Sequence, residues 1–416
     1  MEGIERLGKE YPEELKQNPI GRELLMTWMG KAQQIRRQNM KVNAVAGKLF
    51  SMLREDGLRC CILKGQGNAL MYPNPYSRTP GDIDVWIHAS RERIIEYASK
   101  KFELEDDIRL QHLETSLDGV PVELHFFPCS MNNPIYHTRL QKWFRRNADL
   151  QCSHIVGLPD GAGDIAIPTT AFNVIYQLMH LYHHFFDEGI GMRQIIDYYY
   201  VVCDFYKVYQ NSSKITPSLF TIKEGSTSYP DPLTLRGEGG NRPTRCSEPL
   251  RSKDGGPSKV SPDCAGWDRR GVSGDTGSVS CSSGSSITSV SSAFTTDSSA
   301  STALDVVQRE LKYLGLWKFA GAVMYVLHEA LGLSEEKMIA PMDEKRGKLL
   351  LAEILNGGNF GKHFTKYGHF TQQGMAKKYF LKIWRNMHFV RYYPAEALSE
   401  PIFRTWHFFW RMKNRK

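Results

Sequence analysis

The sequence contains no run of eighteen apolar residues, so it predicts no transmembrane helix. Residues 1–6 also lack the basic and then apolar character of a secretory signal peptide. Its eight cysteines form no C-x-x-C pair, which argues against a disulfide framework or a zinc ribbon. We therefore expect a cytoplasmic protein in which the adjacent Cys60 and Cys61 are small buried apolar side chains.

The chain has 416 residues, of which 41% are hydrophobic and 24% charged, as in globular proteins. Its net charge of +8 is unevenly distributed. Residues 361–416 contain twelve Lys and Arg against two Glu, which gives +10 and leaves the preceding 360 residues at −2. The positive charge therefore belongs to the C-terminal segment rather than to the whole protein.

Aromatic residues alternate with the basic ones in this C-terminal segment: Trp384, Tyr392, Tyr393, Trp406, Phe408, Phe409 and Trp410. Such a pattern fits binding to a nucleic acid, docking on an anionic membrane, or an amphipathic helix packed on the core. We favour packing on the core for the aromatic residues. An acidic partner that binds residues 411–416 stays open.

The first 160 residues alternate between helical and strand patterns. Apolar residues at helical spacing predict a helix over 22–57, followed by a strand over 58–63 and a glycine-containing turn at 64–67. A second strand is predicted from Ile83 to Ile87, and Ser90 is placed to cap the next helix. Asp118-Gly119 then predicts a hairpin between about 110–117 and 120–127, so the fold class is α+β with a small mixed sheet.

The rest of the chain is predominantly helical with one interruption. A helix is expected over 169–187, and helical periodicity returns at Leu304 and again at 343–356. Between them, residues 209–302 are rich in Ser, Gly and Pro and bury too little apolar surface to fold, which predicts a long disordered insertion.

The most informative segment is Gly81-Asp82-Ile83-Asp84. Asp82 and Asp84 are two positions apart in a strand, so both project from one face and repel each other unless a cation lies between them. Glu123 and His125 share one face of a later strand and would bring a third acid to a metal site. A solvated strand face is the alternative for the aspartate pair alone.

These residues carry a family resemblance. Leu63-Lys64-Gly65, Tyr72-Pro73, Arg78, Gly81-Asp82-Ile83-Asp84 and Val122-Glu123-Leu124-His125 resemble an uncharacterised nucleotidyltransferase family of Bacteroidetes and other bacteria. That family is a branch of the polymerase-beta-like nucleotidyltransferase superfamily, and the similarity continues through residues 189–197 and the C-terminal helices. The resemblance implies a polymerase-beta-like core within a largely helical protein.

The resemblance also implies a reaction: an acceptor hydroxyl attacks the α-phosphorus of a nucleoside triphosphate and pyrophosphate leaves. Asp82, Asp84 and Glu123 would be the catalytic acids that hold Mg²⁺ or Mn²⁺. Nucleotide contacts are expected from Lys64, Gly65, Gln66, Gly67 and Arg78, although Gly65-Gln66-Gly67 replaces the superfamily's Gly-Ser. A substrate-cleft role is possible for His125, Arg193 and Asp197; the alternative for Arg193 and Asp197 is a local ion pair four residues apart. The acceptor is unknown.

On this basis the chain divides into five segments. They are an N-terminal helical segment (1–39), a catalytic domain (40–160), the first part of a helical domain (161–208), the insertion (209–302) and the second helical part with the basic aromatic segment (303–416). Two rival functions remain: a non-catalytic homologue that binds nucleotide or nucleic acid, and a helical interaction protein. For His180 and His184, four apart on a helix, a packed aromatic face is favoured over a zinc site.

Overall fold

The structure of the chain is a computed structural model that describes residues 12–104, 108–187, 189–210, 303–357 and 375–414. These ranges all belong to one compact unit, formed by residues 1–222 and 300–416. The predicted insertion over 209–302 lies outside the described residues except for its first two positions, which complete helix α8. The predicted domain boundaries stay predictions.

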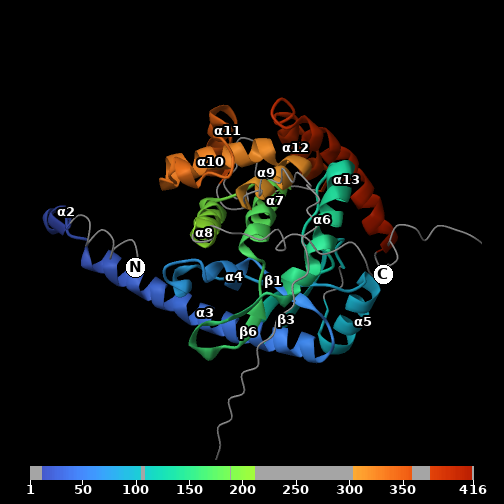
Figure 1. Cartoon of the computed structure of the whole chain (residues 1–416), viewed down its shortest axis with the longest axis horizontal. Coiled ribbons are helices and arrows are strands. Elements are labelled where there is room, and N and C mark those ends of the chain that lie inside the picture. The colour runs from blue at the N-terminus through green and yellow to red at the C-terminus, as the bar shows by residue number, and fades with distance from the viewer. Residues whose placement is uncertain (1–11, 105–107, 188, 211–302, 358–374, 415–416) are drawn as a thin grey trace, which may run out of the picture. The chain divides into compact units, whose positions relative to one another are not determined.

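The described elements confirm a largely helical α+β protein (Figure 1). The strands are β1 (Cys60–Leu63), β2 (Ile83–Ile87), β3 (His112–Leu117), β4 (Val120–His125), β5 (Ile155–Gly157) and β6 (Asp164–Ala166). The helices up to the predicted insertion are α2 (Pro12–Gln17), α3 (Arg22–Glu55), α4 (Gly65–Ala69), α5 (Arg91–Lys101), α6 (Pro134–Ser153), α7 (Thr170–Asp187) and α8 (Met192–Gln210). Those after it are α9 (Ala303–Tyr313), α10 (Trp317–Leu331), α11 (Glu344–Gly357), α12 (Met375–Met387) and α13 (Pro394–Asn414).

The main sheet is small and mixed, as expected. Its strand order is β1-β2-β4-β3, in which β2 and β4 run parallel and the other neighbours are antiparallel. The hairpin between β3 and β4 turns at Asp118 and Gly119, which both have the positive φ that this type of tight turn requires. A separate antiparallel pair, β5 and β6, follows α6.

Each face of the sheet packs against different helices. Ile83, Val85 and Ile87 of β2 point into an apolar cluster with α3 and α5. Asp84 and Trp86 alternate with them and face the side of α6 and α7, because successive side chains of a strand point in opposite directions. Figure 1 shows α3 along the lower side of the sheet, α5 to its right, and α6 and α7 above it.

Stacked aromatic rings join the upper face to these helices. The Trp86 ring lies nearly parallel to that of Phe172 on α7, with ring centroids 6.3 Å apart. Phe172 in turn stacks on Trp143 of α6 at 4.4 Å. Large buried aromatic side chains contribute much apolar area, so this stack positions α7 directly over β2.

The basic C-terminal segment is docked partly by ion pairs. Asp187, at the end of α7, accepts hydrogen bonds from Lys382 of α12 at 2.9 Å and Arg404 of α13 at 3.0 Å. The buried Arg385 donates to the backbone oxygen of Phe185 at 2.9 Å. Lys382 and Arg404 are thus paired with an acid of the chain itself, while an acidic partner for residues 411–416 stays a prediction.

The prediction that the C-terminal aromatic residues pack on the core is correct only in part. Tyr393 is buried, but Trp384, Trp406, Phe408 and Phe409 are between 44% and 61% exposed. The prediction is wrong for these four. Helices α12 and α13 form an outer layer, so only one face of each helix is covered and the aromatic side chains on the other face are exposed. Within the described residues, no helix combines the length and the apolar character needed to cross a membrane.

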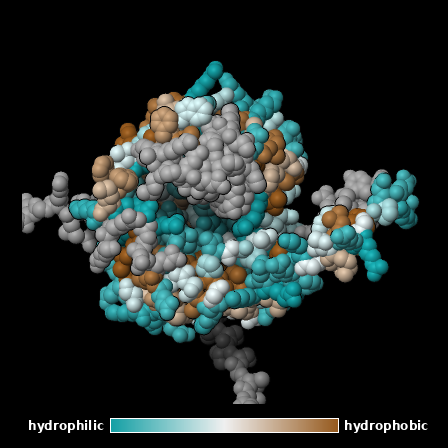
Figure 2. Space-filling view, turned by 180° about the vertical axis from the view of Figure 1, so that it is seen from behind, coloured by the Kyte–Doolittle hydropathy of each residue, from teal (hydrophilic) through white to brown (hydrophobic). Residues whose placement is uncertain are grey.

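Helix α3 provides a matched pair of glycines that tests how it packs. A methyl group on Gly47 would overlap the backbone oxygen of Ala162, whereas one on Gly30 would meet nothing within 4 Å. Gly30 lies in the half of α3 that extends beyond the sheet, where Trp28 and Met29 are exposed. In Figure 2, hydrophobic (brown) and hydrophilic (teal) residues are mixed on this projecting half of the helix.

We expect Gly47→Ala to lower the free energy of unfolding by about 1–3 kcal/mol, because a close-packed contact is forced apart. Gly30→Ala should raise it by up to about 1 kcal/mol, because alanine is the better helix former. Urea denaturation of both variants measures the difference. Equal effects of the two substitutions would show that α3 does not pack against Ala162.

A second prediction concerns the pH dependence of the docked α13. Glu396 is buried and accepts hydrogen bonds from the backbone nitrogens of Asn132 and Asn133 at 2.6 and 3.3 Å. Burial raises the pKa of its carboxyl to about 7 from an ordinary value of 4.5. Between these values the folded protein holds a proton that the unfolded chain has lost, so this group's contribution to stability falls as pH rises.

The loss amounts to about 3 kcal/mol between pH 4.5 and 7. Glu396→Gln, which cannot ionise and keeps one acceptor oxygen for the Asn132 nitrogen, should flatten this part of the profile. The measurement is the urea midpoint of both proteins at several pH values. Parallel profiles for wild type and variant would contradict the prediction.

Candidate active site

Three carboxylates converge on the sheet face that lies toward α7. Asp82 precedes β2, Asp84 lies within it, and Glu123 lies on β4 directly opposite Asp84. One oxygen of each lies within 4.8 Å of the others. Asp82 is exposed, Asp84 is buried and Glu123 is partly buried, so the group opens to solvent on the Asp82 side. The convergence predicted from the strand pattern is confirmed.

Two basic side chains lie among these acids. Lys64 Nζ is 2.9 Å from Asp84 Oδ1. His125 Nε2 lies between Asp84 Oδ1, at 3.0 Å, and Glu123 Oε2, at 3.1 Å. They reduce the repulsion between carboxylates that are close together and largely removed from water.

The acids differ in proton affinity because their neighbours differ. Burial alone would raise the pKa of Asp84, but Lys64 and His125 hold it well below its ordinary value. Burial likewise acts against ionisation of Glu123, yet the hydrogen bond with His125 lowers its pKa. Desolvation and the like charge of Asp84 raise the pKa of Asp82. Asp84 and Glu123 are therefore ionised at neutral pH and available as ligands.

The turn after β1 brings Lys64 to the acids. Lys64 has φ +53°, a conformation that is uncommon for a residue with a side chain. The helix that follows is held from two sides: the buried Gln66 donates to Asn43 of α3, and Asn68 accepts from Asn173 of α7 at 3.0 Å. This polar anchoring stabilises the strained turn.

The predicted nucleotide-binding residues of this turn have different surroundings. Gly65 has φ +38°, and a methyl group there would lie 3.6 Å from the backbone oxygen of Asp82, so the turn lies beside the acids. Gln66 is directed to α3. A methyl group on Gly67 would crowd Ile167 at 3.0 Å, which gives this glycine a packing role.

Two histidines of α7, His180 and His184, continue the site beyond Lys64. His180 Nε2 lies 3.4 Å from Lys64 Nζ, and His184 Nε2 lies 3.1 Å from His180 Nε2. The His180 ring stacks on Tyr176 with centroids 6.2 Å apart, which agrees with the predicted aromatic face. Burial and the adjacent Lys64 charge lower the pKa of His180 well below its ordinary value, so this imidazole is neutral.

Arg78 and Asp197 form a buried pair next to the acids. Arg78 donates to both carboxylate oxygens of Asp197, at 2.8 and 2.9 Å, and Tyr72 donates to the same carboxylate at 2.6 Å. The expectation of a local pair between Arg193 and Asp197 is wrong, because Arg78 occupies both oxygens. Arg193 is exposed instead, and its guanidinium lies near Gly81 at the open side of the carboxylates.

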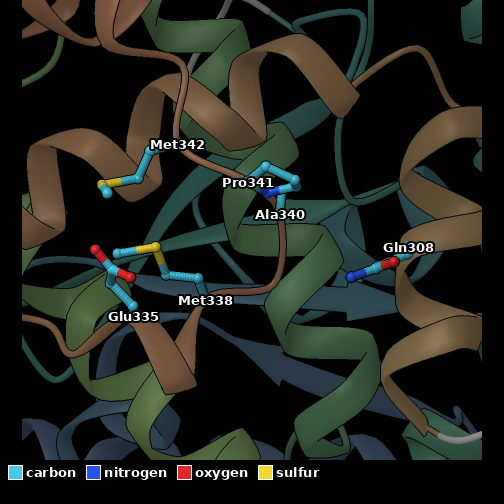
Figure 3. A pocket seen from close by; sticks show the side chains of 6 residues that line it. All are labelled: Gln308, Glu335, Met338, Ala340, Pro341 and Met342. Carbon is cyan, nitrogen blue, oxygen red and sulfur yellow. The ribbon is translucent and has the colours of Figure 1, made fainter.

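A hollow that none of the carboxylate residues lines differs from the carboxylate cluster in its chemistry. It measures about 330 Å³ and is lined by Gln308, Glu335, Met338, Ala340, Pro341 and Met342 (Figure 3). Only Glu335 among these side chains carries a charge, and Figure 3 shows it beside the two methionines. This hollow lacks the converging polar groups found around Asp84.

Comparison with known proteins points to the same part of the chain. Residues 7–209 match a family described as "Uncharacterised nucleotidyltransferase". The matched range contains every residue of the carboxylate cluster and its cationic neighbours.

No curated protein matches the sequence. A solved structure that does match is an antigenic nucleotidyltransferase-like protein from Paracoccidioides brasiliensis, 16% identical, with 39% of this chain and 75% of that chain covered. The TM-score is 0.26, so the topology described above rests on this chain alone.

Sequence reasoning missed His112 and the contact between His180 and Lys64. His112 is the cross-strand partner of His125, and its Nδ1 lies 3.5 Å from Glu123 Oε2. The hairpin turn at 118–119 implies this register, so counting back from the turn could have found His112. Nothing in the sequence indicates which face of α7 turns toward Lys64.

The Arg78–Asp197 pair generates a stability prediction. Asp197→Ala leaves the buried Arg78 charge without its partner, so we expect a loss of about 3–5 kcal/mol in the free energy of unfolding. Tyr72→Phe removes one hydrogen bond to the same carboxylate and should cost only about 1 kcal/mol. Urea titrations of both variants decide the matter; similar losses for the two would mean that the ion pair does not anchor this loop.

Proposed function

We propose that this protein is a metal-dependent nucleotidyltransferase that moves a nucleoside monophosphate from a nucleoside triphosphate to an acceptor hydroxyl, with release of pyrophosphate. The observation that carries the proposal is the convergence of Asp82, Asp84 and Glu123 on adjacent strands. The family match over residues 7–209 supports the same reaction class.

The donor set fits Mg²⁺ or Mn²⁺. All three groups offer carboxylate oxygens, the ligands that hard divalent cations prefer, and Asp82 is open to solvent where a triphosphate could share the ion. When bound, such ions neutralise phosphate charge and make an acceptor hydroxyl more acidic.

The chain's own groups supply the remaining functions. Asp82 and Asp84 would bind the ion that the triphosphate shares, and Glu123 would complete the set and accept the proton of the acceptor hydroxyl. Lys64 is placed to offset charge on the phosphates from the buried side, next to Asp84. Arg193 is placed to do so from the exposed side, near Gly81.

Arg78 has a different part in this proposal from the direct nucleotide contact expected at first. Both of its hydrogen bonds to Asp197 are buried, so its charge is already matched. We assign it to positioning: it fixes the loop that leads into Gly81 and Asp82. His125 likewise holds Asp84 and Glu123 at their observed separation.

The test is pyrophosphate release from each of the common nucleoside triphosphates with Mg²⁺ or Mn²⁺. Asp84→Asn should lower the rate at least roughly 100-fold, because metal-assisted charge stabilisation contributes several kcal/mol. The matched control is Asp118→Asn, an exposed aspartate at the hairpin turn whose positive φ asparagine accepts readily. Its rate should stay within about twofold of wild type.

The same experiment separates the rival functions. Nucleotide binding without pyrophosphate release in the presence of cell-derived small molecules, RNA and protein acceptors would favour a non-catalytic homologue. Wild type and Asp84→Asn behaving alike in both binding and release would contradict the proposal.

A further inference from the structure

A second cluster of possible ligands adjoins the carboxylates and differs from them in chemistry. His112 begins β3, His125 ends β4, and the two are direct cross-strand partners with ring centroids 5.0 Å apart. Glu123 projects from the same face of β4 two residues earlier. One ring nitrogen of His112, one of His125 and a carboxylate oxygen of Glu123 lie within 4.8 Å of one another.

We propose that His112, Glu123 and His125 form a site for a nitrogen-preferring divalent transition ion such as Zn²⁺, separate in ligand chemistry from the all-oxygen site of Asp82 and Asp84. Imidazole nitrogen suits zinc and its neighbours, whereas Mg²⁺ takes oxygen ligands. Glu123 belongs to both clusters, so the two sites are contiguous.

The spacing of the ligand atoms fits one ion. Glu123 Oε2 lies 3.1 Å from His125 Nε2 and 3.5 Å from His112 Nδ1. Ligands bound at about 2.0–2.2 Å around a tetrahedral or octahedral ion are about 3–3.5 Å from each other. Asp84 Oδ1, 3.0 Å from His125 Nε2, is within reach as a fourth donor.

The outer nitrogen of His112 faces a carboxylate, as the outer nitrogens of metal-binding histidines usually do. His112 Nε2 faces Glu114 Oε1 at 3.5 Å, and Arg109 holds that carboxylate at 2.6 Å. Ligating histidines usually have such a carboxylate or polar group behind them, which fixes the ring orientation.

His112 is largely buried, and no hydrogen bond of its ring to the described residues offsets the cost of that burial. Its side chain is only 12% exposed, yet neither ring nitrogen has a hydrogen-bond partner among the described residues. A buried polar group without a partner costs free energy, and an ion at Nδ1 would supply the missing interaction. The opening beside Glu123, which is 22% exposed, gives access from solvent.

The test measures Zn²⁺ binding to the full-length protein by competition with a chromophoric chelator, in millimolar Mg²⁺ and without nucleotide. We expect one zinc ion that Mg²⁺ does not displace. His112→Ala should weaken it at least roughly tenfold, since loss of even an outer-shell partner typically costs 10–100-fold. His388→Ala, which changes an exposed histidine of the C-terminal segment, should leave zinc affinity unchanged.

Equal zinc affinities for His112→Ala and His388→Ala, or displacement by Mg²⁺, would overturn the proposal. Zinc-edge X-ray absorption of the loaded wild type is a check that needs no variant: scattering from two imidazoles supports the site, and an all-oxygen shell refutes it. Because no nucleotide is present, failure here would leave the proposed nucleotidyl transfer untouched, and failure of that reaction would leave the zinc measurement valid.

Discussion

The parallel pairing of β2 with β4 is the constraint on which the carboxylate cluster depends. It sets Asp84 beside Glu123, with His125 two residues further along the same face. A slip of one residue in β4 would turn both side chains toward α3 and bring Val122 and Leu124 to the opposite face. The apolar cluster on the α3 side therefore secures the geometry of the acids, because the wrong register would place Glu123 and His125 inside that cluster.

Such a register brings like charges together, and the rest of the site compensates for them. Lys64 reaches Asp84 only because its backbone takes a positive φ, and polar contacts from α3 and α7 stabilise that turn. His125 separates Asp84 from Glu123. Lys64 and His125 thus supply positive charge among carboxylates that the strand register holds close together.

Local sequence patterns predicted much of the fold. The bounds of β2, the hairpin turn and the helix capped by Ser90 all follow from signals within a few residues, and Ser90 does accept a hydrogen bond from the Arg93 nitrogen. The acids could be predicted because a strand's two-residue period determines which side chains share a face.

Other contacts depend on how distant elements meet. Arg78 and Asp197 are 119 positions apart, and no local pattern links them. The same holds for Lys64 and His180, which meet only because ring stacking on Phe172 sets the position of α7 above the sheet. The exposure of the aromatic residues of α12 and α13 is unpredictable for the same reason, because an amphipathic pattern does not tell which layer of helices lies outermost.

The uneven charge along the chain has a structural use that is separate from binding a partner. Lys382 and Arg404 converge on Asp187, and the two cations hold the pKa of that carboxyl far below its ordinary value despite burial. Asp187 ends the helix that carries His180 and His184 over the acids. Part of the basic C-terminal segment thus secures the far end of α7, while Phe172 secures its near end over β2. Net charge alone would suggest a nucleic-acid or membrane surface, yet these two cations are matched by an acid in the body of the protein.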